Sequence, residues 1–181
     1  MKVKFMMGLL LVSVFMLSAC SGTTGNSDQD VKLDSLFLEE SHEAVKEAYG
    51  DDYIPSMAYE LEQLKDIFGI TVEDVDAFIA EGPMMSVHVD TFLAIRAKEG
   101  KGDSIAAELE AYREKLIQDS MQYPMNMAKV NASTVYVVGD HVYFLMLGKI
   151  NENGNQSEEE ALEYEKDQVK KAIDAIEELL K

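Results

Sequence analysis

The chain has 181 residues, of which 34 are acidic and 16 are basic, so its formal net charge is −18 at pH 7. This balance argues against a nucleic-acid partner, because phosphate contacts need clustered lysine and arginine side chains. The single cysteine, Cys20, excludes a scaffold held together by internal disulfides. The length is sufficient for one domain of ordinary size and short for two.

The N-terminus carries the clearest signal in the sequence. Lys2 and Lys4 form a short positive region before an apolar segment over residues 5–17. This segment is shorter than the ~20 residues that a membrane-spanning helix needs. The segment ends in Leu17-Ser18-Ala19-Cys20, which resembles the lipobox of bacterial lipoproteins. The alternative is an ordinary signal peptide or a membrane helix in which the cysteine is incidental.

The lipobox resemblance implies a lipoprotein signal peptide over residues 1–19, cleaved before Cys20. It also implies acylation of Cys20 with diacylglycerol and palmitate, and a location on the extracytoplasmic side of the cell membrane. Residues 20–32 then form the lipidated cysteine and a flexible tether, because they are rich in small polar residues and lack an apolar period. Residues 33–181 remain for one folded domain.

Three helices are predicted in the first part of this domain. Apolar residues recur at helical spacing over residues 33–49 and again over residues 57–68, and Gly50 and Gly69 end the two segments. A pattern that resembles a capping box begins residues 71–82 and predicts a short third helix there.

Strand patterns appear in the second part. Residues 86–97 alternate with a period of two and predict a strand. Residues 134–138 and 142–147 flank Gly139-Asp140-His141 and predict a β-hairpin. A helix over residues 102–116 separates the strand from the hairpin.

A second capping box, Ser157 with Glu160, begins a closing acidic helix. The order of helices, strand, helix, hairpin and helix predicts a single α+β domain. In this domain a small, mostly antiparallel sheet is packed by about five helices.

Both faces of the predicted sheet are partly apolar, whereas a half-exposed sheet alternates more cleanly. Either helices cover both faces, or one face contacts a partner. The candidate contact surface consists of Phe92, Tyr136 and Tyr143 on one sheet face, or of the loop that carries Tyr123 and Met125.

Five short motifs occur in a fixed order along the chain. They are Tyr49-Gly50-Asp51-Asp52-Tyr53-Ile54-Pro55, Phe68-Gly69-Ile70, Val89-Asp90-Thr91, Gln122-Tyr123-Pro124-Met125-Asn126 and Gly139-Asp140-His141-Val142-Tyr143. Together they resemble a family of uncharacterised bacterial lipoproteins, the domain of unknown function DUF4358, over roughly residues 45–150. The resemblance implies an extracytoplasmic, lipid-anchored α/β domain, and it implies no activity and no catalytic residues.

No catalytic residue is predicted from the sequence. Cys20 is used by the lipid, there is no Gly-x-Ser-x-Gly motif, and His42, His88 and His141 are distant in sequence. Paired carboxylates, which a glycosidase needs across its cleft, are so frequent among 34 acidic residues that a solvated surface explains them better.

The strongest metal-binding pattern is His88 with Asp90, which would point to the same side of a strand, with His141 approaching from the hairpin. Methionines in two loops would suit soft Cu(I), namely Met84, Met85, Met125 and Met127. Local hydrogen bonds of histidine and gap filling by methionine are simpler explanations. We therefore predict no metal and no cofactor.

The sequence thus predicts a lipid-anchored extracytoplasmic protein, leaning away from an enzyme and toward a binding or adaptor module at the cell envelope. Its expected partners are the membrane, through the lipid on Cys20, and an envelope protein. The alternative is a protein or enzyme with an unrecognised site for a small molecule or an envelope polymer. A concave pocket with convergent polar groups would favour that alternative.

Overall fold

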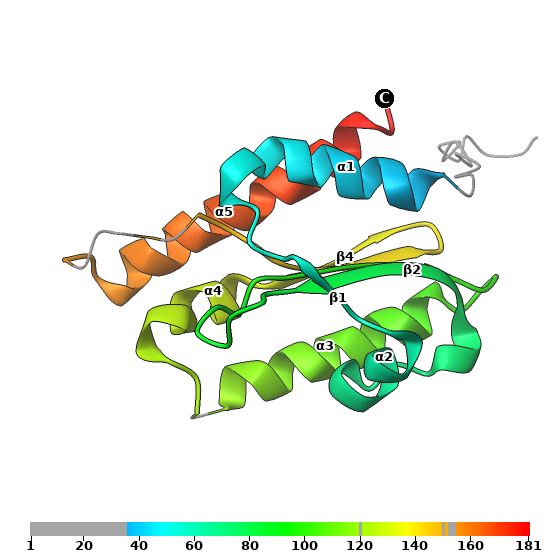
Figure 1. The fold of residues 1–181 in the computed structure, drawn as a ribbon, viewed down its shortest axis with the longest axis horizontal. Helices are drawn as coiled ribbons and strands as arrows, with labels where there is room; N and C mark the ends of the chain where they lie inside the picture. The colour runs from blue at the N-terminus through cyan, green and yellow to red at the C-terminus, as the bar shows by residue number, and fades with distance from the viewer. Residues whose placement is uncertain (1–35, 120, 150, 152–154) are drawn as a thin grey trace, which may run out of the picture. The chain divides into compact units, whose positions relative to one another are not determined.

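A five-stranded antiparallel sheet forms the centre of the fold (Figure 1). The computed structural model describes residues 36–119, 121–149, 151 and 155–181, so the predicted signal peptide, Cys20 and the tether lie outside the described residues. The spatial order of the strands is β1-β2-β3-β5-β4. Their bounds are Met57–Ala58 for β1, Val75–Gly82 for β2, Thr91–Ala97 for β3, Thr134–Val138 for β4 and His141–Met146 for β5.

Five α-helices pack on this sheet, in line with the predicted α+β class. They are α1 (Phe37–Tyr49), α2 (Leu61–Phe68), α3 (Gly102–Gln118), α4 (Met127–Ala132) and α5 (Glu158–Glu178). Figure 1 shows α1 and α5 on one face of the sheet and α2 and α3 on the other. The short helix α4 lies at one end of the sheet and packs against α5.

The two central strands, β3 and β5, are buried on both faces. Phe92 and Tyr143 pack against α1 and α5 in one core, and Leu93 and Phe144 pack against α2 and α3 in the other. Successive strand residues point to opposite faces, so a sheet covered twice needs apolar residues at almost every position. This explains why the sequence shows apolar residues on both faces.

Helices of the chain itself therefore occupy the sheet face that was a candidate contact surface. Phe92 and Tyr143 are fully buried, and the Tyr143 hydroxyl donates a hydrogen bond to Ser41 Oγ of α1 over 3.2 Å. Tyr136 is partly buried in the same core, and its hydroxyl donates to Glu177 Oε1 of α5 over 3.3 Å. In this fold Phe92 and Tyr143 cannot contact a partner, because α1 and α5 lie over them.

The helix predicted over residues 71–82 is wrong: only Val72–Asp74 form a 3-10 turn, and the following residues form β2. The Thr71 hydroxyl does not cap a helix; it donates to Glu108 Oε1 of α3 over 2.6 Å. Residues 75–82 then pair with β3 and alternate between the two cores, with Phe78 on the α2–α3 side and Ile79 on the α1–α5 side. Pairing with a central strand overrides the local helix signal.

The predicted hairpin, the helix that begins at Gly102 and the capping box of the closing helix are all confirmed. The backbone N–H of Glu160 donates to Ser157 Oγ over 3.2 Å, and the backbone N–H of Ser157 donates to Glu160 Oε2 over 2.8 Å. Acidic residues in this first turn also interact favourably with the helix dipole. Helix α4 was not predicted, because its six residues are too few to show a helical period.

We expect Phe92→Ala to lower the free energy of unfolding by about 3–5 kcal/mol, since it empties a fully buried aromatic site. Urea unfolding followed by circular dichroism measures this change. Tyr123→Ala, at an exposed aromatic residue, is the control and should stay within about 0.5 kcal/mol of the natural protein. Equal, small effects of both changes would contradict the placement of Phe92 in the core.

Candidate functional site

Three connecting segments meet at the end of the sheet where β2 leads into β3 (Figure 1). They are the segment before β3, the segment before α4 and the segment between β5 and α5. Together with α5 they enclose a cavity of about 150 Å³. Its walls are formed by Val87, His88, Asp90, Met125, Asn126, Lys129, Asn151 and Glu165.

A buried ion pair forms one wall of the cavity. Lys129 Nζ lies 2.7 Å from Asp90 Oδ1 and donates a second hydrogen bond to the carbonyl oxygen of Gly148 over 2.8 Å. Both side chains are almost completely buried. The interaction joins the start of β3, helix α4 and the segment after β5, so the charges that line the cavity also fix the three elements around it.

Gly148 allows α5 to approach this wall. A Cβ atom at position 148 would lie 2.7 Å from Gln168 Cβ and 3.0 Å from Glu165 Oε2, closer than side-chain atoms tolerate. The absence of a side chain therefore brings the backbone of residue 148 directly against α5. The same contact places Glu165 beside the ion pair.

Glu165 is the unusual group of the site. Its side chain is 4% exposed, and Oε2 has no hydrogen-bond partner among the described residues. Burial raises the pKa of this carboxyl to about 7; the Lys129 ammonium opposes the shift and Asp90 adds to it. At neutral pH the group is therefore divided between its neutral and ionised forms.

Asn126 holds the two loops at the mouth of the cavity together. Its Nδ2 donates to the carbonyl oxygen of Val87 over 2.9 Å, and its backbone N–H donates to the carbonyl oxygen of Tyr123 over 2.8 Å. The second bond closes the 3-10 turn Pro124–Asn126, in which proline occupies the first position. The loop is thus fixed from both sides.

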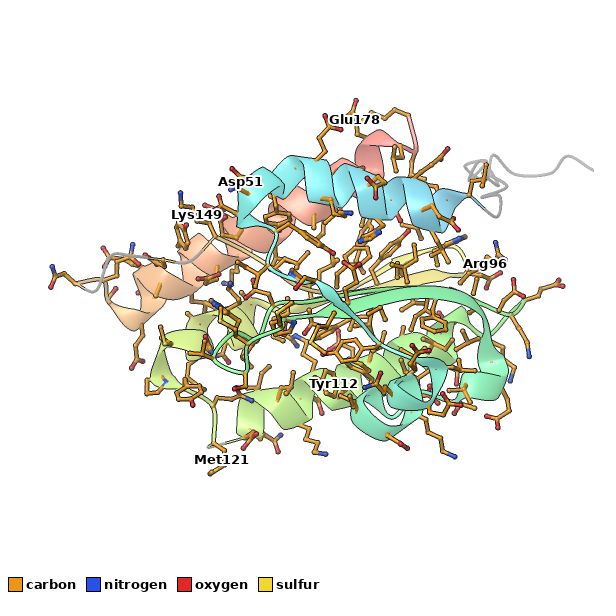
Figure 2. All side chains as sticks on the ribbon, viewed as in Figure 1. Asp51, Arg96, Tyr112, Met121, Lys149 and Glu178 are labelled. Carbon is orange, nitrogen blue, oxygen red and sulfur yellow. The ribbon has the colours of Figure 1, made fainter. Side chains whose placement is uncertain are left out.

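Exposed apolar side chains lie along these two loops, which contribute Val87 and Met125 to the cavity wall. Met121, Met84 and Met125 are 86%, 72% and 70% exposed, and Figure 2 shows Met121 at the outer end of its loop. Val87 and Met125 also line the cavity, so this surface continues into it. We call it the methionine-rich rim; it consists of Met84, Met85, Val87, Met121, Tyr123 and Met125.

The structure brings together some of the residues singled out from the sequence and separates others. His88 and Asp90 both line the cavity, but they precede β3, which begins at Thr91, so they do not share a strand face as predicted; Tyr123 and Met125 lie on the rim. His141 is at the opposite end of β5, where it pairs with Arg96 and packs edge-on against Phe37 at 5.2 Å. Burial lowers its pKa, and no described residue hydrogen-bonds to its ring nitrogens.

The described residues contain no group of three or more His, Cys, Asp or Glu side chains placed to hold a metal ion. Met84, Met85 and Met125 are exposed on the rim, whereas Met127 is partly buried against a neighbouring hollow. Over the same part of the chain, no helix is both long and apolar enough to cross a membrane.

A second buried polar cluster lies under α1. His42 Nε2 is 3.0 Å from Glu81 Oε2, and the Tyr53 hydroxyl donates to the same oxygen over 3.0 Å. The His42 ring stacks on Phe92 with a centroid distance of 5.1 Å. These groups satisfy one another, so the cluster is explained by packing.

Sequence reasoning missed Lys129 and Glu165. Lys129 falls in a short segment that carries no helix signal, and Glu165 falls in an acidic helix that reads as a solvated surface. One signal was available: Glu165 precedes the buried Val169 by one helical turn, which places it on the buried face of α5.

The fold and the site define an α+β domain with two helical layers and a small, partly charged cavity at one end of its sheet. A family model described as "Domain of unknown function (DUF4358)" matches residues 48–147, and the chain belongs to this family. The match includes Asp90 and Lys129 and ends before Glu165. Comparison with curated proteins and with solved structures gives no match.

We expect the stability of the natural protein to fall as pH rises from about 4.5 to 7. The pKa of Glu165 is raised in the folded state, so between these values the folded state binds more protons than the unfolded state. Ionising the buried carboxyl should cost about 1–3 kcal/mol. Urea unfolding of the natural protein and of Glu165→Gln, at pH 5 and at pH 8, measures the effect.

In Glu165→Gln this part of the pH dependence should disappear, and the variant should be the more stable protein at pH 8. Glu163→Gln, at an exposed position of the same helix, is the matched control and should keep the natural pH dependence. Parallel pH profiles for the natural protein and Glu165→Gln would contradict the assignment.

Proposed function

We propose that this protein is a lipid-anchored, extracytoplasmic binding module that holds a small polar ligand in the cavity beside Asp90, Lys129 and Glu165. One observation carries the proposal: Glu165 Oε2 is buried at the cavity without a hydrogen-bond partner among the described residues. Buried polar atoms in native proteins are almost always paired. A ligand that forms the missing hydrogen bond would explain why this oxygen atom is buried without a partner.

The dimensions of the cavity support a compact ligand. A volume of about 150 Å³ is that of a cavity that takes a benzene-sized molecule. Pockets for drug-sized ligands are larger, at about 300–1,000 Å³. The ligand, or the part of it that enters the cavity, therefore has only a few non-hydrogen atoms.

Binding is favoured over catalysis by the way the charges are arranged. Asp90 and Lys129 neutralise each other in a direct ion pair, so neither is free to exchange protons with a substrate at little cost. The groups that interact with Glu165 among the described residues include these same two paired side chains, and Glu165 Oε2 makes no hydrogen bond to any described residue.

The position at which the chain enters the domain supports a cavity that faces away from the membrane. Helix α1 begins at one end of the sheet, where Phe37 packs against His141 at the start of β5, whereas the cavity residue Lys129 bonds to Gly148 beyond the end of β5. A chain attached to the membrane at Cys20 enters this domain through α1, so the cavity would lie at the end remote from the point of entry. A ligand or partner in the surrounding medium then reaches the cavity without passing the membrane surface.

An adaptor role is the second candidate, and the exposed Tyr123 and Met125 on the methionine-rich rim favour it. A protein partner would dock on the rim, whereas a small ligand would enter the cavity. The two candidates are separated by the size of the molecule that stabilises the protein.

We expect a protein-free filtrate of an envelope extract to raise the thermal unfolding temperature of the natural protein. Val87→Trp should abolish this stabilisation, because the larger side chain closes the mouth of the cavity without touching the ion pair. Val137→Trp, at an exposed site on β4, is the matched control and should respond like the natural protein. Stabilisation by the protein fraction alone would favour the adaptor role, and an undiminished response of Val87→Trp would overturn the cavity as the site.

We expect the natural protein to incorporate a palmitate analogue that carries an alkyne when cells are labelled metabolically, because Cys20 is the only thiol in the chain. Cys20→Ala should carry no label, and Thr23→Ala should be labelled like the natural protein. In-gel fluorescence after attachment of a dye measures the incorporation. Equal labelling of Cys20→Ala would contradict lipid anchoring at this residue.

A further inference from the structure

We propose that the ligand is a small organic cation whose primary ammonium group enters the cavity and pairs with Glu165 while its apolar part lies on the methionine-rich rim. This inference rests on the cavity site proposed above and names the chemical class of its ligand. Three independent features of the structure support it: the charge of the cavity wall, the available acceptors and the apolar surface at the mouth.

The wall of the cavity has an excess of negative charge. Among the described residues that line it, Asp90 and Glu165 are carboxylates, and Lys129 is the one lysine or arginine. Lys129 already pairs with Asp90 at 2.7 Å, so it compensates an ionised Glu165 only in part, and the three groups together carry a net negative charge. A positively charged ligand offsets this charge, whereas an anion would add to it.

The charge of the whole chain acts in the same direction. A formal net charge of −18 creates a field that concentrates cations near the protein and repels anions. The local and the overall electrostatics therefore select the same sign of ligand.

The groups at the cavity suit an ammonium ion better than a metal ion. An ammonium group donates three hydrogen bonds; Glu165 Oε2 is an unpartnered acceptor, and the other residues that line the cavity include Asp90 and Asn126, whose side chains also carry acceptor oxygens. Metal ligation would need three or more coordinating side chains in one place, and the described residues contain no such group. A hydrogen-bonded cation makes no demand of this kind.

The methionine-rich rim favours a ligand whose ammonium group is attached to an apolar chain. Val87 and Met125 line the cavity and belong to the exposed rim. The apolar part of a ligand that extends out of the cavity therefore lies against them. Methionine thioethers are flexible and polarisable and adapt to varied apolar shapes. Each methylene group that becomes buried there should tighten binding by up to about fourfold.

Binding of an ammonium ion requires Glu165 in its ionised form, so the neutral form releases one proton to solvent when the ligand binds. The groups that interact with Glu165 are Asp90 before β3, Lys129 on α4 and Tyr49 on α1, and the half-buried His88 also lines the cavity. Because the pKa of Glu165 lies at about 7, affinity should rise about tenfold between pH 6 and pH 8.

The test is isothermal titration of the full, natively lipidated protein in detergent, with empty micelles as the blank. The probes are methylammonium, propylammonium and hexylammonium, with hexanoate and hexanol as analogues of opposite and no charge. We expect hexylammonium to bind most tightly, methylammonium most weakly of the three amines, and hexanoate not at all. Affinity for hexylammonium should be about tenfold higher at pH 8 than at pH 6.

Two pairs of variants assign the contacts. Glu165→Gln should weaken hexylammonium at least tenfold at pH 8 and remove the pH dependence, whereas the exposed Glu163→Gln should change neither. Met125→Ser should weaken hexylammonium and leave methylammonium unchanged, and the exposed Ile67→Ser on α2 should affect neither probe.

The outcomes separate the ligand class from the site. Tighter binding of hexanoate or hexanol than of hexylammonium, lost in Val87→Trp, would overturn the cationic ligand and leave the cavity as the site. Unchanged binding of hexylammonium to Glu165→Gln would overturn the role of this carboxylate. Failure of every probe, combined with an undiminished response of Val87→Trp to the envelope filtrate, would overturn both proposals.

Discussion

The buried ion pair between Lys129 and Asp90 is the interaction on which the cavity end of the sheet depends. It fixes the start of β3, the short helix α4 and the backbone of Gly148 in one place. A helix of six residues has little stability of its own. Its position therefore comes from the contact of Lys129 with the sheet and from its packing against α5. A buried pair of this kind is costly to break, because either partner alone would be an uncompensated charge.

The rest of the fold follows from a sheet that is covered on both faces. With β3 and β5 buried on both sides, the chain needs a helical layer above and below, and α1 with α5 and α2 with α3 supply them. The helices leave one end of the sheet to be closed by connecting segments. Connecting segments carry polar backbone and side chains, so a cavity with charged walls forms there and not between the helical layers.

The sequence predicted those parts of the fold whose signal is local. The hairpin, the helix from Gly102 and the capping box at Ser157 depend on residues close together in the chain, and the structure confirms them. Residues 71–82 resisted prediction because Thr71 bonds to Glu108 on α3 and β2 pairs with β3, both of which are distant contacts. Phe92 and Tyr143 were candidates for a contact surface, and the structure buries them. Apolar residues on both faces of a sheet do not reveal whether helices of the same chain or a partner cover each face.

The same distinction applies to the site. His88 with Asp90, and Tyr123 with Met125, stood out because a chemical pattern is visible within a few residues. Lys129 did not, because what marks it is its pairing with Asp90, which is 39 positions away. The burial of Glu165 was not predicted because α5 carries many acidic residues. In the sequence, its position one turn before Val169 is what distinguishes it from them.

The site contains two buried carboxylates, and their effects on the stability of the fold differ. Asp90 is compensated by Lys129 within the protein, and both residues lie in the part of the chain that matches the DUF4358 family. Glu165 comes from α5, outside that match; Lys129 compensates its charge only in part, and Glu165 Oε2 has no hydrogen-bond partner among the described residues. Burial raises the pKa of this carboxyl, so its ionised form destabilises the fold, whereas a glutamine of similar volume would carry no such cost. The two groups therefore differ in their physical roles: Asp90 and Lys129 hold three elements together, whereas Glu165 places an ionisable oxygen at the cavity. In the binding site that we propose, α5 would supply the group that pairs with the ligand.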